Sequence, residues 1–145
     1  MLDRRVSAEL RPFADSDEEQ VVALWHACGL VRPWNDPHRD IARKRLVQPE
    51  LFLVADDGAV AATAMAGYDG HRGWVYYVAV RSDLRGCGLG RRMMAEVEVR
   101  LLALGCPKVN VQIRSGNEPV TAFYDRLGYA PDGASGLGKR LIPDG

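Results

Sequence analysis

The stretch that decides the fold is W74-V-Y-Y-V-A-V80, followed after four residues by R85-G-C-G-L-G90. The first segment is apolar or aromatic at every position, which is typical of a β-strand buried in mid-sheet. The second segment has three glycines in five positions, and each fixed glycine costs backbone entropy. A strand, a glycine-rich turn and a helix start together predict an anion site, because the first helical N–H groups have no partner within the helix.

Basic side chains flank these glycines, and guanidinium groups suit phosphate oxygens: Arg85, Arg91 and Arg92. The Walker A pattern is excluded, since no Lys-Ser/Thr pair follows the glycines. The dinucleotide pattern G-x-G-x-x-G fits Gly86 and Gly88 but meets Arg91 where the third glycine belongs. The remaining pattern is [RQ]-x-x-G-x-[GA], and Arg85, Gly88 and Gly90 match it.

Farther along the chain stand N117-x6-Y124 and then G128-Y129. With R85-G-C-G-L-G90 after Y77-V-A-V80, this arrangement resembles the GNAT superfamily of acyl-CoA-dependent N-acetyltransferases. Three further segments are similar to its small bacterial YpeA-like acetyltransferases: R32-P-W-N-D-P37, G67-Y-D-G-H-R-G73 and L137-G-K-R-L-I142. The resemblance covers essentially the whole chain. It implies an α/β (α+β) fold, with a mixed, mostly antiparallel central sheet flanked by about four helices.

The residue patterns give a compatible order of elements. Apolar periodicity predicts strands near residues 6–12, 51–55, 60–66, 74–80 and 108–113, with short final strands at Tyr129 and at 137–142. Helix starts are predicted at the capping box S16-D-E-E19, at Asp36-Pro37, after the glycine-rich loop and at Asn117. The second helix should run through Leu46, and we expect the shortened end of the chain to leave a sheet edge for a second subunit, hence a homodimer.

The resemblance also implies which residues bind the co-substrate acetyl-CoA. Backbone groups of the strand would pair with the pantetheine arm, and the loop amides would hold the pyrophosphate. Asn117 would contact the co-substrate from the next helix. The residues expected to bind acetyl-CoA are therefore Val78, Ala79, Val80, Arg85, Gly86, Cys87, Gly88, Leu89, Gly90, Arg91 and Asn117.

Acetyl transfer requires a neutral amine, a donor for the tetrahedral oxyanion and a proton for the leaving thiolate. An N–H group near Val78 would serve the oxyanion. The resemblance places Tyr124 near the sulfur as the catalytic acid, with a hydroxyl pKa of ~10 against ~8.5 for a thiol. The strand lacks the glutamate that many family members carry, so the general base stays open between Asp69, His71 and a water chain through Tyr76 or Tyr77.

Four residues are candidates for the acceptor side of the site: Trp34, Asp69, His71 and Tyr76. Trp34 stands in a turn-rich segment, where a tryptophan either lines a pocket or closes the edge of the core. The D69-G-H-R72 cluster reads either as a solvated hairpin turn or as part of the acceptor entrance, with a histidine that titrates near neutral pH.

Composition sets outer limits on the function. The chain has 145 residues, which fits one domain over 1–145, and its 19 basic and 19 acidic side chains cancel. Charge balance argues against nucleic-acid and membrane-surface binding. The three cysteines form no CxxC pair and no zinc-ligand spacing with a histidine, so we expect no metal. No apolar run suits a signal peptide or a membrane span, so we expect a cytoplasmic protein.

The sequence therefore predicts an acetyl-CoA-dependent N-acetyltransferase acting on a primary amine, either a small amine or an amine of a peptide or protein. The alternative hypothesis is a catalytically weak acyl-CoA-binding or sensor module of the same fold. The missing strand carboxylate favours the alternative, whereas the presence of both Asn117 and Tyr124 favours the enzyme.

Overall fold

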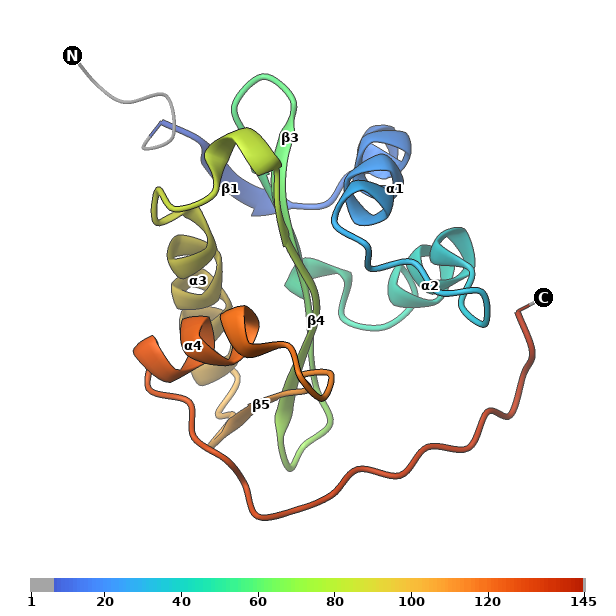
Figure 1. Cartoon of the computed structure of the whole chain (residues 1–145). Coiled ribbons are helices and arrows are strands. Elements are labelled where there is room, and N and C mark those ends of the chain that lie inside the picture. Colours follow the sequence, from blue (N-terminus) through green and yellow to red (C-terminus); the bar gives the residue numbers. More distant parts are fainter. Residues whose placement is uncertain (1–6, 145) are drawn as a thin grey trace.

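The computed structural model describes residues 7–144 and shows a sheet with helices on both faces (Figure 1). Its strands are β1 (Glu9–Pro12), β2 (Phe52–Asp56), β3 (Val60–Tyr68), β4 (Gly73–Val80) and β5 (Val109–Val111). Its α-helices are α1 (Glu18–Ala27), α2 (Pro37–Lys44), α3 (Leu89–Ala103) and α4 (Glu118–Arg126). Within the described residues, the expected sheet with about four helices is confirmed.

The strands lie side by side in chain order, β1-β2-β3-β4-β5. The first three pairings are antiparallel and the last, β4 with β5, is parallel. A parallel neighbour requires a crossover connection, which α3 supplies between β4 and β5. The mixed, mostly antiparallel sheet expected from the resemblance is therefore present.

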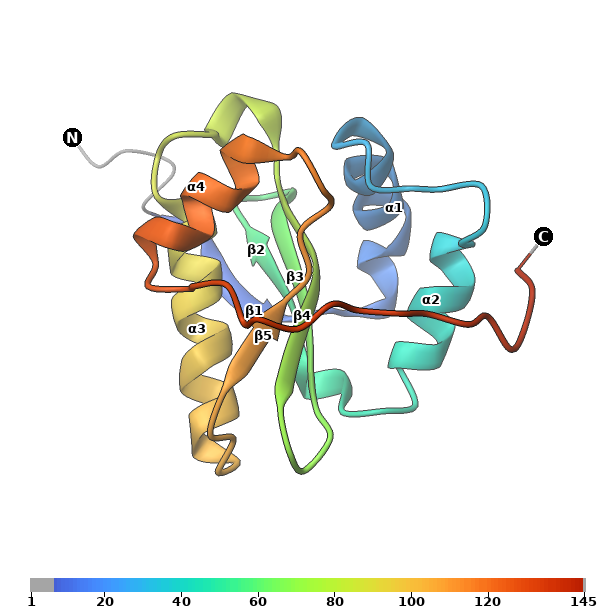
Figure 2. The ribbon, with the colours of Figure 1, turned by 60° about the horizontal axis from the view of Figure 1, so that its bottom comes forward.

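Helices α1 and α2 cover one face of the sheet, and α3 and α4 cover the other (Figure 1, Figure 2). The alternation of side chains along β2 separates two cores. Leu53 and Ala55 pack in the core that includes α3, whereas Phe52 and Val54 pack with α1 and α2. Each strand of this kind is buried on both faces, which accounts for its unbroken apolar sequence.

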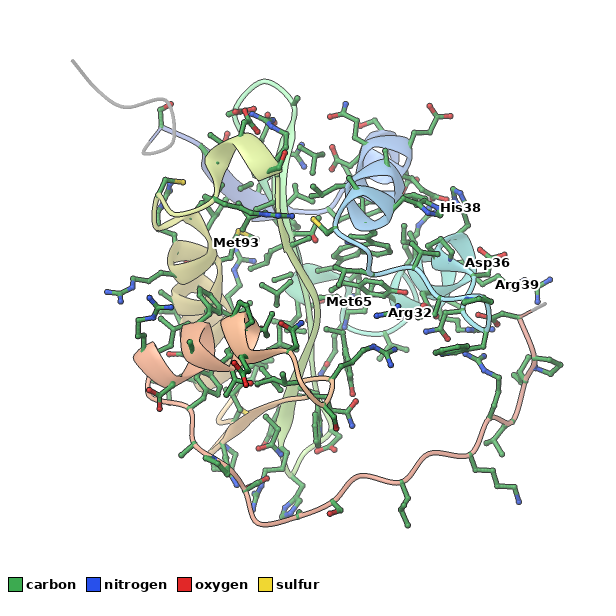
Figure 3. The ribbon with its side chains drawn as sticks, viewed as in Figure 1. Arg32, Asp36, His38, Arg39, Met65 and Met93 are labelled. Carbon is green, nitrogen blue, oxygen red and sulfur yellow. The ribbon has the colours of Figure 1, made fainter. Side chains whose placement is uncertain are left out.

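Three of the four predicted helix starts are confirmed, including the start of α3 in the glycine-rich loop, and the start at Ser16 is wrong. The Asp36 carboxylate accepts hydrogen bonds from the first amides of α2 (Figure 3), and the Asn117 side chain accepts from Val120 N. Ser16 does not cap α1, because a 3-10 turn over Asp15–Asp17 precedes that helix. The Asp17 carboxylate supplies the cap-like bond instead, since it accepts from Ala14 N at 2.8 Å.

The predicted extension of α2 and the predicted final strands are wrong. Helix α2 ends at Lys44, and the Leu46 side chain is exposed. Residues 127–144, Tyr129 included, contain no strand; Leu137 is fully exposed and Leu141 is 85% exposed, so neither buries an apolar face that would fix a strand register. This segment, which we call the tail, runs instead from the end of α4 to α2 (Figure 2). The homodimer through a sheet edge stays a prediction.

Candidate active site

The second half of β4 has an open edge. Strand β5 pairs with Gly73, Trp74 and Val75 of β4. The pairing stops there because β5 ends at Val111, two residues before the end of the predicted strand 108–113. The prediction that β4 is buried in mid-sheet throughout is therefore wrong for its second half, where Tyr76 is 46% exposed. An unpaired strand edge presents backbone N–H and C=O groups to whatever approaches it.

The direction of these backbone groups follows from one hydrogen bond. Arg81 N donates to Ala61 O at 2.8 Å, so the Arg81 amide faces the β2–β3 side of β4. Amide direction alternates along a strand, which turns the N–H groups of Val78 and Val80 toward the open edge. Val78 and Val80 are the residues whose backbone groups are expected to pair with the pantetheine arm, and the N–H near Val78 is the one expected to serve the oxyanion.

A β-bulge interrupts β4 beside this edge. Between the pairs Met65–Tyr76 and Thr63–Ala79, β4 has one residue more than β3, and Tyr77 takes a left-handed φ of 53°. Thr63 secures the bulge, because its hydroxyl donates to the Tyr77 carbonyl and accepts from the Trp25 indole N–H. Trp25 also stacks on the Tyr77 ring at 3.7 Å. The strained backbone is thus held by buried contacts on the α1 side.

The loop that follows β4 needs its glycines. Gly86 and Gly88 have φ values of 75° and 87°, a region that other residues rarely occupy. Gly90 is needed for space, since a Cβ there would lie 3.2 Å from the Phe123 ring and close to Val80. The Cys87 thiol donates to the Leu84 carbonyl, so it belongs to the loop's own hydrogen bonds. The loop ends at Leu89, where α3 begins and presents its first amides.

The flanking arginines differ in their surroundings. Arg91 is exposed at the start of α3. Arg85 is also exposed, and its Nε donates to the Val80 carbonyl at 3.4 Å, which brings the loop and the open edge together. Arg92 points elsewhere, because its guanidinium donates to the carbonyl of Ala8, just before β1.

Helix α4 lies against the loop through Phe123 and carries Tyr124 beside it. Tyr124 is 7% exposed, and burial raises the pKa of its hydroxyl to about 12. The neighbouring Tyr129 ring is 5.5 Å away, and its hydroxyl donates to Glu98. Within residues 7–144, the Tyr124 hydroxyl has no hydrogen-bond partner. It is therefore a protonated group at neutral pH that is not committed to a structural contact.

The acceptor candidates fall into two places. Trp34 is half-exposed, lies under the Arg114 guanidinium at 5.8 Å, and lines a cavity of about 730 Å³. The other walls of the cavity are formed by Asn35, Arg43, Gln112 and tail residues Gly138, Lys139, Arg140, Leu141 and Ile142. The tail is thus part of this cavity, which the sequence analysis missed because it expected a strand there.

Asp69 and His71 lie in the turn between β3 and β4, at the opposite end of β4 from the glycine-rich loop. The Asp69 carboxylate accepts from His71 N and Arg72 N at 2.7 Å, and these bonds lower its pKa. Burial and the charge of Asp69 raise the pKa of the Tyr76 hydroxyl. The structural role of Asp69 in the turn is clear, whereas the part of these three residues in acceptor binding stays a prediction.

A carboxylate that no sequence pattern indicated reaches β4 from another element. The Tyr77 hydroxyl donates to Asp40 of α2 at 2.6 Å, and burial followed by this contact raises the pKa of the Tyr77 hydroxyl well above its ordinary value. No pattern along β4 could reveal Asp40, because 37 residues separate the two groups. Cys28 was missed for the same reason; its thiol lies 3.7 Å from the Val80 carbonyl.

Two negative findings apply to residues 7–144. No group of three or more His, Cys, Asp or Glu side chains in this range is arranged to hold a metal ion. Nor is any helix in it long and apolar enough to cross a membrane.

Comparison with known proteins agrees with this geometry. Residues 14–129 match the acetyltransferase (GNAT) family. An acetyltransferase of Yersinia enterocolitica is 48% identical over 137 residues, covering 94% of this chain and 97% of that protein. An acetyltransferase of Sodalis glossinidius is 47% identical over 138 residues, with the same coverage.

Solved structures share the fold at lower identity. Ard1 of Thermoplasma volcanium superposes with a TM-score of 0.74 at 20% identity, covering 86% of this chain and 83% of its own. A putative acetyltransferase of Agrobacterium tumefaciens gives a TM-score of 0.71 at 20% identity, covering 92% of this chain and 99% of its own. With the family match and the close relatives, the conclusion is direct: this chain belongs to the acetyltransferase (GNAT) family.

Proposed function

We propose that this protein is an N-acetyltransferase that takes an acetyl group from acetyl-CoA and moves it directly to a primary amine. One observation carries the proposal: the open half of β4 leads into a glycine-rich loop at the N-terminus of α3. Coenzyme A has two parts that such a surface suits. Its amide-bearing arm pairs with a strand edge, and its pyrophosphate accepts hydrogen bonds from helix-start amides.

The residues that would hold acetyl-CoA follow from this fit. The backbone of Val78, Ala79 and Val80 would hold the arm, and Asn117 would contact it from α4. The pyrophosphate would lie on the amides of the loop and of the first turn of α3, with charge from two arginines: Arg85, Gly86, Cys87, Gly88, Leu89, Gly90 and Arg91. When bound, acetyl-CoA supplies the acetyl group as a thioester.

The transfer then needs a proton donor and an oxyanion donor from this chain. As the amine nitrogen bonds to the acetyl carbon, the carbon–sulfur bond breaks, the amine loses a proton and the thiolate gains one. Tyr124 is the candidate donor because its hydroxyl has no hydrogen-bond partner within residues 7–144 and its pKa of about 12 keeps it protonated at neutral pH. Transfer to a thiolate of pKa ~8.5 is uphill, so the proton has to move while the carbon–sulfur bond breaks. The Val78 amide, on the open edge beside the bulge, is suited to the oxyanion.

Asp40 is our proposal for the general base, acting through the Tyr77 hydroxyl that it contacts at 2.6 Å. Asp40→Asn should lower kcat at pH 7 by about tenfold to a hundredfold. The loss should shrink as the pH approaches the pKa of the amine, because solution then supplies the neutral amine. A pH–rate profile of wild type and variant checks this, and a loss that stays constant up to pH 10 would exclude Asp40 as the base.

The test of the proposal is a calorimetric titration of the purified protein with acetyl-CoA and, separately, with ATP and NAD. Micromolar binding of acetyl-CoA alone, followed by thiol release when amines are added, is the expected result. Binding without thiol release for any amine would favour the catalytically weak acyl-CoA-binding module. Absence of acetyl-CoA binding by the folded protein would reject both functions.

A further inference from the structure

A group of cationic side chains without carboxylate partners lies around Trp34. Arg32 is on the same turn, which the Asn35 N to Arg32 O hydrogen bond closes at 3.0 Å. Arg114, which follows β5, stands over the Trp34 ring, and Lys139 of the tail lines the same cavity. Within residues 7–144, none of these three cations forms an ion pair. We call Arg32, Arg114 and Lys139 the Trp34 cations.

The two arginines that line this cavity are already neutralised. Arg43 contacts the Asp40 and Asp144 carboxylates at 3.3 Å and 2.6 Å, and Arg140 contacts Asp144 at 3.5 Å. Asp144 also accepts from Asp36 N at 2.8 Å, so its oxygens are fully used by the protein. The charge that remains for a ligand at this place is therefore positive and comes from the Trp34 cations.

Arg32 provides the most specific indication that an anion binds here. Its Nε is the one buried side-chain nitrogen or oxygen within residues 7–144 that lacks a hydrogen-bond partner. Leaving a charged donor buried and unpaired is costly, so a shift of the Arg32 side chain that brings its guanidinium to an anion would relieve this cost. A guanidinium group binds a carboxylate or a phosphate through two parallel hydrogen bonds. Figure 3 labels Arg32 on the segment between α1 and α2.

The cavity has the size of a small-molecule site. Its volume of about 730 Å³ lies within the range of roughly 300–1,000 Å³ usual for ligand pockets. Its wall combines an aromatic ring, Trp34, with polar groups of Asn35 and Gln112. This combination suits a short apolar stem that carries polar ends.

We propose that this cavity binds the acceptor, and that the acceptor is an amine whose molecule also carries an anionic group, a carboxylate or a phosphate. Arg32 and Arg114 bind the anionic group, and Trp34 packs against the stem between it and the amine. This inference rests on the proposed acetyl transfer, since it names the substrate class of that reaction.

The experiment compares amines in matched pairs that differ by the anionic group: β-alanine with β-alaninamide, and phosphoethanolamine with 2-methoxyethylamine. Binding to the protein loaded with coenzyme A is measured by calorimetry, and thiol release is measured with acetyl-CoA. The anionic member of at least one pair should bind at least about tenfold more tightly than its neutral partner. Whichever pair shows the preference identifies the carboxylate or the phosphate as the group bound.

Arg32→Gln should remove most of that preference, about tenfold, by weakening the binding of the anionic amines. Arg32→Lys, which keeps the charge but not the planar fork, should retain part of it. Arg39→Gln is the matched control, because Arg39 is an exposed arginine of α2 whose contact is with Asp36. Thermal unfolding of each variant shows that the fold is kept.

The outcomes separate the two proposals. Failure of acetyl-CoA to bind rejects the proposed function, and the amine pairs are then still compared on the chain alone. Equal binding within both pairs, no binding of any member, or a preference that Arg32→Gln leaves intact would overturn the inference. Normal acetyl-CoA binding and turnover in those cases would leave the proposed function standing.

Discussion

The two halves of β4 consist of similar residues and have different surroundings. In the first half, Gly73 to Val75 lie between β3 and β5, and Val75 is 3% exposed. Packing there is so close that a Cβ on Gly73 would lie 2.9 Å from the Leu101 side chain. In the second half, Tyr76 to Val80 pair with β3 alone, and Tyr77 adopts a left-handed backbone.

The difference separates structural from functional backbone. In the first half every backbone donor and acceptor can be used by a neighbouring strand, so the segment contributes to stability. In the second half the same kind of chain keeps one edge available, and the glycine-rich loop follows that half after four residues. Binding chemistry therefore depends on which backbone groups the neighbours leave unpaired, and side-chain type says little about it.

The largest effect is expected at Tyr124 of α4, the proposed proton donor. Tyr124→Phe should lower kcat by about 100- to 1,000-fold, because it removes the proton donor for the leaving thiolate. Acetyl-CoA affinity should change less than about twofold, since the ring and its packing remain. Tyr129→Phe, which loses only a hydroxyl bonded to Glu98, is the matched control. Steady-state thiol-release assays check this, and equal kcat for the two variants would contradict the role of Tyr124.

The next effect concerns the bulge that separates the halves. Thr63 is fully buried, and Thr63→Val would leave the Trp25 N–H and the Tyr77 carbonyl without partners. The free energy of unfolding should fall by about 2–4 kcal/mol. Thr121→Val, at an exposed threonine of α4, should cost less than about 0.5 kcal/mol. Urea denaturation measures both, and a loss below about 1 kcal/mol for Thr63→Val would show that Thr63 does not hold the bulge.

A smaller effect is expected in the loop. Gly88→Ala places a Cβ at a φ of 87°, which strains the backbone by about 1–2 kcal/mol without a steric contact. Acetyl-CoA affinity should fall about tenfold as the loop amides shift. Gly58→Ala, at a φ of 106° in the β2–β3 turn and equally free of contacts, should cost similar stability and leave affinity unchanged. If calorimetry gives Gly88→Ala the same acetyl-CoA affinity as the wild type, the loop amides do not bind the co-substrate.

The smallest effect is local and pH-dependent. Contacts with Arg43 and then with Asp36 N lower the pKa of Asp144 to about 2. A carboxyl whose pKa is lower in the folded state favours the docked tail above its ordinary pKa of about 4, and this contribution is lost as the pH falls toward 2. NMR of the amides of residues 138–142 should therefore show increasing motion over that range. At pH 7, Asp144→Asn should give the same change, and Asp125→Asn should not; an ordered tail at pH 2 would contradict this account.

Local patterns predicted much of the fold correctly. The Asp36 and Asn117 caps, the hairpin around residues 56–60 and the strand–loop–helix unit all follow from a few neighbouring residues, and the structure has them. The errors occurred where the outcome depends on distant partners. Residues 137–142 were expected to form a short strand, yet the segment finds no neighbouring strand, and Asp144 joins it to α2 instead.

The sequence alone determined the family resemblance, the glycine-rich loop and the tyrosine of α4, because each depends on residues that are close together in the chain. Only the tertiary structure decided that β5 stops at Val111 and leaves β4 open, that Asp40 reaches Tyr77, and that the tail lines a cavity beside Trp34. The physical reason is common to all three. They are contacts between segments far apart in the chain, set by how helices and strands pack, and no local periodicity encodes them.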